Sequence, residues 1–371
     1  MTQQSMNSLT RATQAVQAMM AAQSAARNLA QGAASGVPNG LASRGLVPDS
    51  GLAGNGVANP VITWVGANTP TQTTSGNQTT VTVQQTQQKA ILNWSSFNVG
   101  SNTQLYFNQS AGNSASGNNW VALNRVTDPS GVPSQILGQI KAEGSVYLIN
   151  ANGIIFGGGS QINVGSLIAS SLNLFSNDLA TSNNRFLNGG IGDLNTTNVA
   201  TSSILLTTNT SGAGNVMVAP GASIDVSDQG LALIAAPNVT NSGMITAPSG
   251  QVALIAGIGV SYDYNKSSFQ PGNGAIPQGT NDNSTTNLRF ANYGKLLDAH
   301  GNDITPVGTL TNNGVIYTPR GNITLLGGAI QQNGVAIATT SVAQPGSIIV
   351  NSQYEVGVNP GSRNPADEFD Q

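Results

Sequence analysis

The sequence contains no cysteine and one histidine, and it carries few charges for its 371 residues. The lack of cysteine excludes disulfide bonds, thiol catalysis and zinc–thiolate sites. Charged residues make up 7% of the chain, whereas about 25% is usual in soluble proteins. With a net charge of −3, the chain offers no basic surface for nucleic acid. We therefore expect no nucleic-acid partner, and one histidine leaves no recognisable Ser-His-Asp triad.

Long apolar runs are missing as well. No run approaches the roughly 18 residues of a transmembrane helix. Between Met1 and Ala30 the longest run is Ala18–Ala22, which is too short for the apolar core of a signal peptide. If the protein is exported, we expect that a leader has been removed or lies upstream.

What the chain has in abundance is glycine, with 45 residues, together with Asn, Ser, Thr and Gln. After Pro60, short Val-, Ile- and Leu-rich segments alternate with Gly/Asn turns, for example Ser145–Ile149, Gln251–Ile255 and Asn322–Leu326. No helix-length periodic segment lies between them. This texture predicts an all-β fold.

The segment before Val61 differs from the rest of the chain. Apolar residues between Leu9 and Leu29 recur every three or four positions, which predicts a helix over residues 5–31. A Gly/Pro/Asn-rich stretch follows and resembles a linker. We interpret residues 1–60 as a helical extension and linker. The helix could pack on the body of the protein or bind a partner helix, and the sequence leaves both open.

An internal repeat defines the fold. Thr240–Gly257 matches Thr311–Gly328, and the Asn313-Gly314 pair recurs one further period along the chain as Asn333-Gly334. A period of roughly 20 residues with two or three short strands fits one coil of a parallel β-helix. Alternate apolar side chains would fill a narrow interior, and Asn-Gly pairs would form the corners. We predict a right-handed parallel β-helix with an N-terminal cap over residues 61–371.

Two stretches interrupt this pattern, at about residues 173–213 and 258–306. Their composition is typical of loops or small β-additions that leave the coils. The second contains Asp298, His300 and Asp303, the one candidate cluster for a metal ion. A single histidine in a polar loop is more often solvated, so we expect no metal and no cofactor.

Ordered sequence blocks between residues 79 and 175 resemble the two-partner-secretion domain at the head of filamentous-haemagglutinin-type exoproteins. The blocks are Lys89–Gly100, Phe107–Gln109, Ala122–Val126, Ser134–Ile140, Gly144–Gly157 and Val164–Ser170. The resemblance implies the N-terminal secretion domain of a large adhesin-like exoprotein of a Gram-negative bacterium. It also implies recognition by the periplasmic modules of an outer-membrane transporter, followed by β-helix folding at the cell surface.

The resemblance assigns roles to particular residues. Asn150, Ala151, Asn152 and Gly153 match the family's Asn-Pro-Asn-Gly motif for transporter recognition and folding, with Ala151 where the family usually has proline. Asn side chains also suit turns, so a structural role is compatible with recognition. Five further motif residues are expected to be structural, with the aromatic ones in the core or the cap: Trp94, Phe97, Asn124, Arg125 and Phe156.

Three functions remain open at this level. The favoured one is a secretion and scaffold domain that is not an enzyme, secreted or at the cell surface, with a host-cell or bacterial receptor as a possible further partner. The second is a stand-alone haem- or glycan-binding exoprotein that uses the two insertions. The third is a carbohydrate-active β-helix enzyme, although the acidic residues do not gather in one repeat register.

Overall fold

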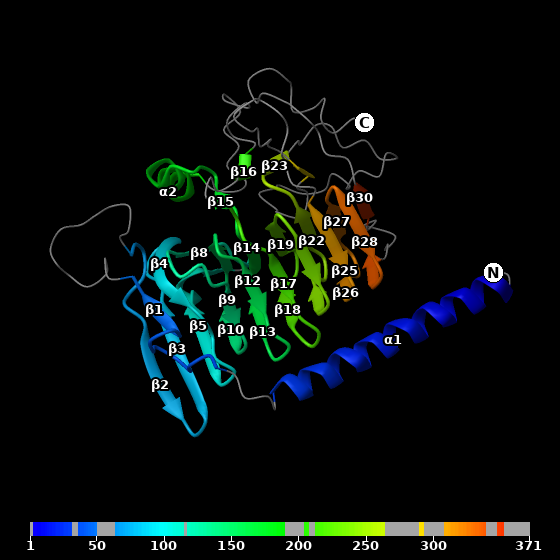
Figure 1. The fold of residues 1–371 in the computed structure, drawn as a ribbon, viewed down its shortest axis with the longest axis horizontal. Coiled ribbons are helices and arrows are strands. Elements are labelled where there is room, and N and C mark those ends of the chain that lie inside the picture. Colours follow the sequence, from blue (N-terminus) through cyan, green and yellow to red (C-terminus); the bar gives the residue numbers. More distant parts are fainter. Residues whose placement is uncertain are drawn as a thin grey trace, which may run out of the picture.

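The computed structural model describes residues 3–31, 36–49, 64–114, 117–189, 204–207, 212–263, 289–292, 308–338 and 347–351. Three long sheets wrap around a common interior and form a parallel β-helix (Figure 1). From β9 onward each coil runs through sheet III, sheet II and sheet I in that order. The predicted β-helix is confirmed, and a right hand is what the chirality of parallel crossovers favours.

Sheet I has nine strands, which in spatial order are β1 (Leu46–Pro48), β4 (Lys89–Phe97), β8 (Val121–Val126), β11 (Ser145–Asn150), β14 (Ser166–Ser170), β19 (Leu231–Ala236), β22 (Gln251–Ala256), β27 (Asn322–Leu326) and β30 (Ser347–Asn351). Sheet II also has nine: β2 (Thr71–Ser75), β3 (Gln78–Gln84), β5 (Thr103–Asn108), β10 (Gln139–Ala142), β13 (Gln161–Val164), β18 (Ser223–Val226), β21 (Met244–Thr246), β26 (Val315–Thr318) and β29 (Val335–Ala338). Sheet III has six: β9 (Ser134–Ile136), β12 (Ile154–Phe156), β17 (Val216–Val218), β20 (Val239–Asn241), β25 (Thr309–Asn312) and β28 (Ala329–Gln332).

The sequence repeat corresponds to coils that stack directly on each other. Thr240 pairs with Thr311 in sheet III, Ile245 with Ile316 in sheet II, and Leu254 with Leu325 in sheet I. The alignment of Thr240–Gly257 with Thr311–Gly328 is therefore the physical register of two neighbouring coils. The following coil continues it, because Val315 pairs with Val335.

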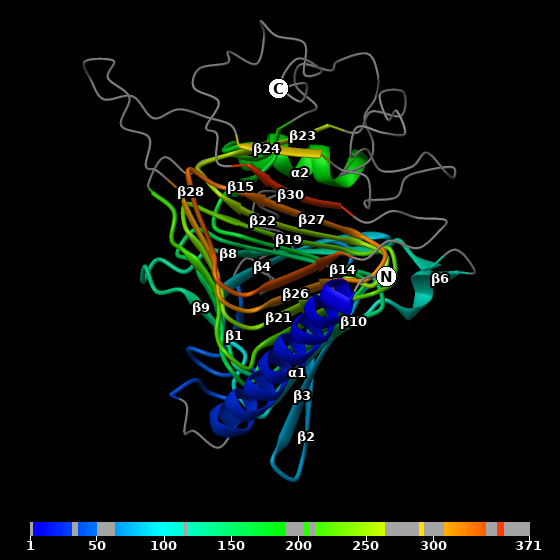
Figure 2. The same cartoon turned by 90° about the vertical axis from the view of Figure 1, so that its right-hand side faces the viewer.

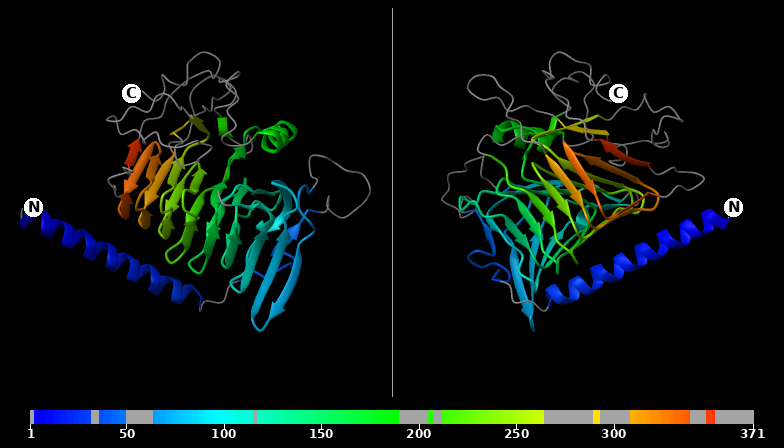
Figure 3. Two further views of the ribbon diagram at one scale, coloured as in Figure 1. Left: turned by 180° about the vertical axis from the view of Figure 1, so that it is seen from behind. Right: turned by 45° about the vertical axis from the view of Figure 1, so that its right-hand side comes forward.

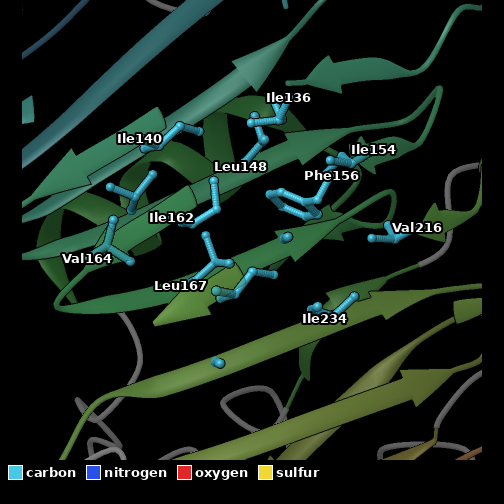
Figure 4. Close-up of a cluster of buried hydrophobic side chains, with 14 of the residues drawn as sticks. Ile136, Ile140, Leu148, Ile154, Phe156, Ile162, Val164, Leu167, Val216 and Ile234 are labelled. Carbon is cyan, nitrogen blue, oxygen red and sulfur yellow. The ribbon is translucent and has the colours of Figure 1, made fainter. Parts of the chain in front are cut away.

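Alternate side chains of the three sheets fill the interior of the coils (Figure 4). Figure 4 shows Ile136 of β9, Ile140 of β10, Leu148 of β11 and Phe156 of β12 among the side chains that fill this interior. Strands with one inward and one outward face keep a period of two in burial, as in β5.

A second hydrophobic cluster covers the outer face of sheet I, and the two insertions build it. Strands β15 (Asn173–Leu174), β16 (Ile204–Thr207), β23 (Val260–Asp263) and β24 (Arg289–Asn292) form one four-stranded antiparallel sheet. Because β16 pairs with β23, the first insertion is joined to the second. Strands β19 and β22 are consequently buried at every position, as expected for a sheet covered on both faces.

The first insertion also contains a helix, α2 (Leu179–Asn188), that the expectation of loops and small β-additions did not include. Its N-cap is Asp178, whose side chain accepts a hydrogen bond from Thr181 N at 2.8 Å. Hydrogen bonding from Thr181, through its side chain first and its backbone N–H second, lowers the pKa of Asp178. Figure 2 shows α2, β23 and β24 on the same side of the β-helix, above sheet I, and α2 contacts β4.

The N-terminal end of the stack is closed by antiparallel segments. Strand β1 pairs with β4, and β2 forms a hairpin with β3. Bridges from Val65 to Ile91 and from Ala67 to Gln85 add to this cap. The stretch that we interpreted as a linker thus contributes strand β1 to the cap. Its residue Leu46 pairs with Phe97 and is fully buried. Short elements complete the chain: α1 (Gln3–Gln31), β6 (Asn113–Ser114), β7 (Gly117–Asn118) and the 3₁₀-helix η2 (Ser110–Gly112).

Leu254→Asp is expected to destabilise the protein by several kcal/mol, because Leu254 is fully buried in the inner core and the new carboxylate would have no partner there. Gln331→Asp, at an exposed position of β28, serves as the control and should change the free energy of unfolding by about 0.5 kcal/mol or less. Urea unfolding followed by circular dichroism measures both. Equal stability of the two variants would contradict the inward placement of Leu254.

Candidate functional site: the Asn150–Gly153 turn and the N-terminal core

Residues Asn150–Gly153 form the corner that connects β11 of sheet I to β12 of sheet III. Gly153 N donates a hydrogen bond to Asn150 O at 2.9 Å, which closes a four-residue turn. Asn152 N donates to the Asn150 side-chain Oδ1 at 3.0 Å. Asn150 thus organises the turn with both its backbone carbonyl and its side chain, as short amide side chains commonly do.

The two asparagine side chains also tie the turn to the preceding coil. Asn150 Nδ2 donates to Ser134 Oγ at 2.9 Å, and Asn152 Nδ2 donates to Asp128 O at 2.7 Å. Asn150 is 1% exposed. Asn152 is half-buried. In the folded protein, therefore, the amide of Asn150 is closed to other molecules, and that of Asn152 is held against the preceding coil.

The backbone of the turn is held by the following coil. Gly214 N donates to Ala151 O at 2.7 Å, and Ile154 N donates to Asn215 O at 3.1 Å. Gly153 adopts a φ of 101°, and a Cβ there would lie 2.5 Å from Asn215 O. Glycine is required for both reasons, since only glycine combines this φ with such close backbone approach.

Ala151 occupies the second position of the turn, and it is half-buried. Proline is favoured at this position because its fixed φ suits the turn. The departure from the family's Asn-Pro-Asn pattern therefore keeps the turn and loses only the preorganisation that proline would add.

Ala151→Pro is expected to stabilise the folded protein by about 0.4–1 kcal/mol, because it restricts the unfolded chain. Asn152→Pro is the matched control: it removes the N–H that donates to Asn150 Oδ1 and should destabilise the fold. Thermal unfolding of the two variants tests this, and a loss of stability in Ala151→Pro would contradict the assignment of the turn.

Trp94 and Phe97, both on β4, form an aromatic cluster beneath the cap. The ring of Trp94 makes edge contacts with Trp64 and Phe97 at centroid distances of 5.0 and 5.2 Å. Trp94 also shares a column of sheet I with Val126 and Asn150. The cluster and the turn are consequently two strands apart in one sheet, and Phe156, just after the turn, is buried in the same core.

Asn124 is a fully buried polar residue on the inner face of β8. Its Oδ1 accepts a hydrogen bond from Trp94 Nε1 at 2.9 Å, and its Nδ2 donates to the carbonyls of Ala122 and Tyr147 at 3.2 Å each. Asn124 thus satisfies the one polar atom of the Trp94 ring inside an apolar core.

Asn124→Leu is expected to destabilise the fold by about 2 kcal/mol, because Trp94 Nε1 would be buried without an acceptor. Adding Trp94→Phe to the same chain removes that N–H and should recover part of the loss. Urea unfolding of the single and double variants measures the coupling. Strictly additive effects would argue against the Trp94–Asn124 hydrogen bond.

Arg125 lies on the opposite, outer face of β8, where it is 7% exposed. Its guanidinium donates to Asn183 Oδ1 and, at 2.7 Å, to Ser182 Oγ, both on α2. Burial lowers the pKa of Arg125 to about 10. Arg125 therefore fastens α2 to sheet I and takes no part in the turn.

Gln109 belongs to one of the motif blocks, and the sequence alone predicts no role for it. It is fully buried at the corner between sheets II and I, where its Nε2 donates to Gln85 Oε1 and its Oε1 accepts from Gly144 N, both at 2.8 Å. Gln109 thereby links three successive coils. Its position directly after a strand and before Gly-rich turns is the only signal that the sequence offers.

Within the part of the chain that the structure describes, no three His, Asp or Glu side chains come together to hold a metal ion. Asp298, His300 and Asp303 lie outside the described residues. Over the same part of the chain, no helix has both the length and the apolar character to cross a bilayer.

The arrangement defines a class of protein: a parallel β-helix with a closed N-terminal cap, an Asn-x-Asn-Gly corner and two insertions over one sheet. The TPS secretion domain model matches residues 62–282, more than half of the chain. The protein belongs to this family of two-partner-secretion domains, which confirms the resemblance seen in the sequence blocks.

Individual relatives agree with this assignment. The chain is 41% identical over 101 residues to a heme/hemopexin-binding protein of Haemophilus influenzae strain Rd, and 38% identical over 94 residues to another heme/hemopexin-binding protein of H. influenzae. These matches cover 27% and 25% of this chain and only 10% and 9% of those proteins. The HMW1 secretion domain of H. influenzae has the same fold, with a TM-score of 0.55, 23% identity, and coverage of 78% of this chain and 62% of that one.

Proposed function

We propose that this chain directs the export of a longer surface exoprotein and that a two-partner-secretion transporter recognises Asn150–Gly153 while the chain is unfolded. Membership of the secretion-domain family supports the export role. Recognition of the unfolded chain is supported by the near-complete burial of Asn150 and by the internal hydrogen bonds of Asn150 and Asn152. The transporter can reach the amide of Asn150 only in an unfolded chain, and unfolding also frees that of Asn152 from its bond to Asp128 O.

The same residues then have a second use outside the cell. Once the chain emerges, the turn connects the Asp128–Ser134 loop of one coil to the Gly214-Asn215 segment of the next. Folding thus withdraws the recognition motif from the transporter and favours movement in one direction. In this proposal the domain nucleates the β-helix and has no catalytic role, and its location is the cell surface or the medium.

Haem or glycan binding by this chain alone has less support. The relatives named for heme/hemopexin binding share only about a tenth of their length with it. A common export route accounts for that short match without requiring a common ligand.

Asn152→Ala is expected to reduce the secreted amount several-fold when the chain is co-expressed with its transporter, because it removes one of the two motif amides. Asn163→Ala, at an exposed position of β13, should leave secretion unchanged. Immunoblots of medium and periplasm give the measurement.

A folding defect must be separated from a recognition defect. Gly214→Ala leaves the motif intact but places a Cβ 2.2 Å from Asn152 O, so it disturbs the packing of the turn. Secretion of Gly214→Ala above that of Asn152→Ala, at equal stability of the refolded proteins, is the expected result. If the two variants are exported equally poorly, or if Asn152→Ala is secreted normally, Asn152 has no part in recognition.

A further inference from the structure

Helix α1 docks on the outside of the β-helix, along the corner between sheets III and II (Figures 1 and 3). Gln23, which is 8% exposed, holds this corner with both ends of its amide: its Nε2 donates to Ser242 O and its Oε1 accepts from Gly221 N, both at 2.6 Å. Arg27 Nε adds a hydrogen bond to Gly221 O at 2.8 Å. The residues joined in this way are 194 to 219 positions apart in the sequence.

The helix follows the stack with about one turn per coil. Ala30 lies against Gly158 in the corner before β13, Arg27 against Gly221 before β18, and Gln23 reaches Ser242 before β21. A helical turn rises about 5.4 Å, and neighbouring strands lie about 4.8 Å apart, so the two repeats nearly match. Further along, α1 contacts β26 of the next coil.

Glycine makes this approach possible. Gly221 has a φ of 89°, and a Cβ on it would lie 2.5 Å from Arg27 N. The corner therefore lets the helix backbone come within contact distance of the coil backbone.

On the outer face of sheet II, one column of side chains changes from polar to apolar along the stack. One outward column consists of Gln139, Gln161 and Ser223 in the earlier coils and continues as Met244, Val315 and Val335 in the later ones. Val315 points away from the core, since its neighbour Ile316 points inward, and yet it is fully buried. Strand β26, which carries Val315, is the strand that α1 contacts. An apolar outward column at this place is what a docked helix requires.

We propose that α1 is an intramolecular latch, which closes on the coils from β12 to β26 once they have stacked and shields the apolar column of sheet II. Its acceptors and donors come from the corners of successive coils, so they exist as a site only after those coils have formed. The latch ties the start of the chain to a strand as distant as β26, and unravelling of the later coils requires its release. This inference is independent of the transporter recognition proposed above.

Hydrogen exchange of the full chain tests the latch. Gln23→Ala with Arg27→Ala should make the α1 amides exchange about tenfold faster or more, because alanine preserves helix propensity while the hydrogen bonds to the corner are lost. Gln17→Ala with Asn28→Ala, at exposed positions of the same helix, is the matched control and should leave exchange unchanged. Identical exchange in the Gln23/Arg27 variant and the parent would overturn the proposal.

A second variant separates the latch from general instability. Val315→Ser gives this column the residue that Ser223 provides two coils earlier. It should lower the unfolding midpoint of the parent, and it should lower that of the Gln23→Ala/Arg27→Ala chain much less, since the helix is already released. Additive shifts would overturn the proposal. Protection of α1 that rises with protein concentration would do so too, because the occupant would then be the helix of a second copy.

Discussion

Parallel backbone pairing between successive coils is the interaction on which the rest of this structure depends. It holds equivalent residues of neighbouring coils in register, as Leu254 over Leu325 and Ile245 over Ile316 illustrate. A single coil has no partner for its backbone groups and too little apolar surface to bury, so stability appears only when coils stack. The antiparallel cap at the N-terminal end gives the first coil the partner that no preceding coil supplies.

Buried polar side chains use the same stacking to fix the corners. Asn241 Nδ2 donates to Asn312 Oδ1 at 2.8 Å, and Asn312 Nδ2 donates to Gln332 Oε1 at 3.0 Å, which forms a ladder along one corner. Gln109 and Asn150 act likewise at other corners. These hydrogen bonds specify register, because a shift of one residue would leave each amide buried without its partner. The Asn150–Gly153 turn is thus built from the same chemistry as the ordinary corners, and folding buries the amide of Asn150.

The outer surfaces show two ways of covering a β-helix. Sheet I is covered by the insertions, which Arg125 fastens through α2. Helix α1 binds the backbone of the corner between sheets III and II through Gln23, and it contacts β26 of sheet II. In both cases a polar side chain sets the position of a helix on the coils. A chain with 7% charged residues has few ion pairs for this purpose, and neutral amides take their place.

The sequence by itself determined the coil. Its short repeat period, its Asn-Gly corners and its alternating Val, Ile and Leu positions are local features, and a local pattern repeated in register is sufficient to specify stacked strands. The motif blocks likewise located the Asn150–Gly153 turn. Only the tertiary structure decided that β16 pairs with β23 across the two insertions, that α2 covers Arg125, and that α1 lies on the Gly221 corner. Contacts between segments tens to hundreds of residues apart depend on which faces remain apolar after the coils have stacked, and that is a property of the assembled surface.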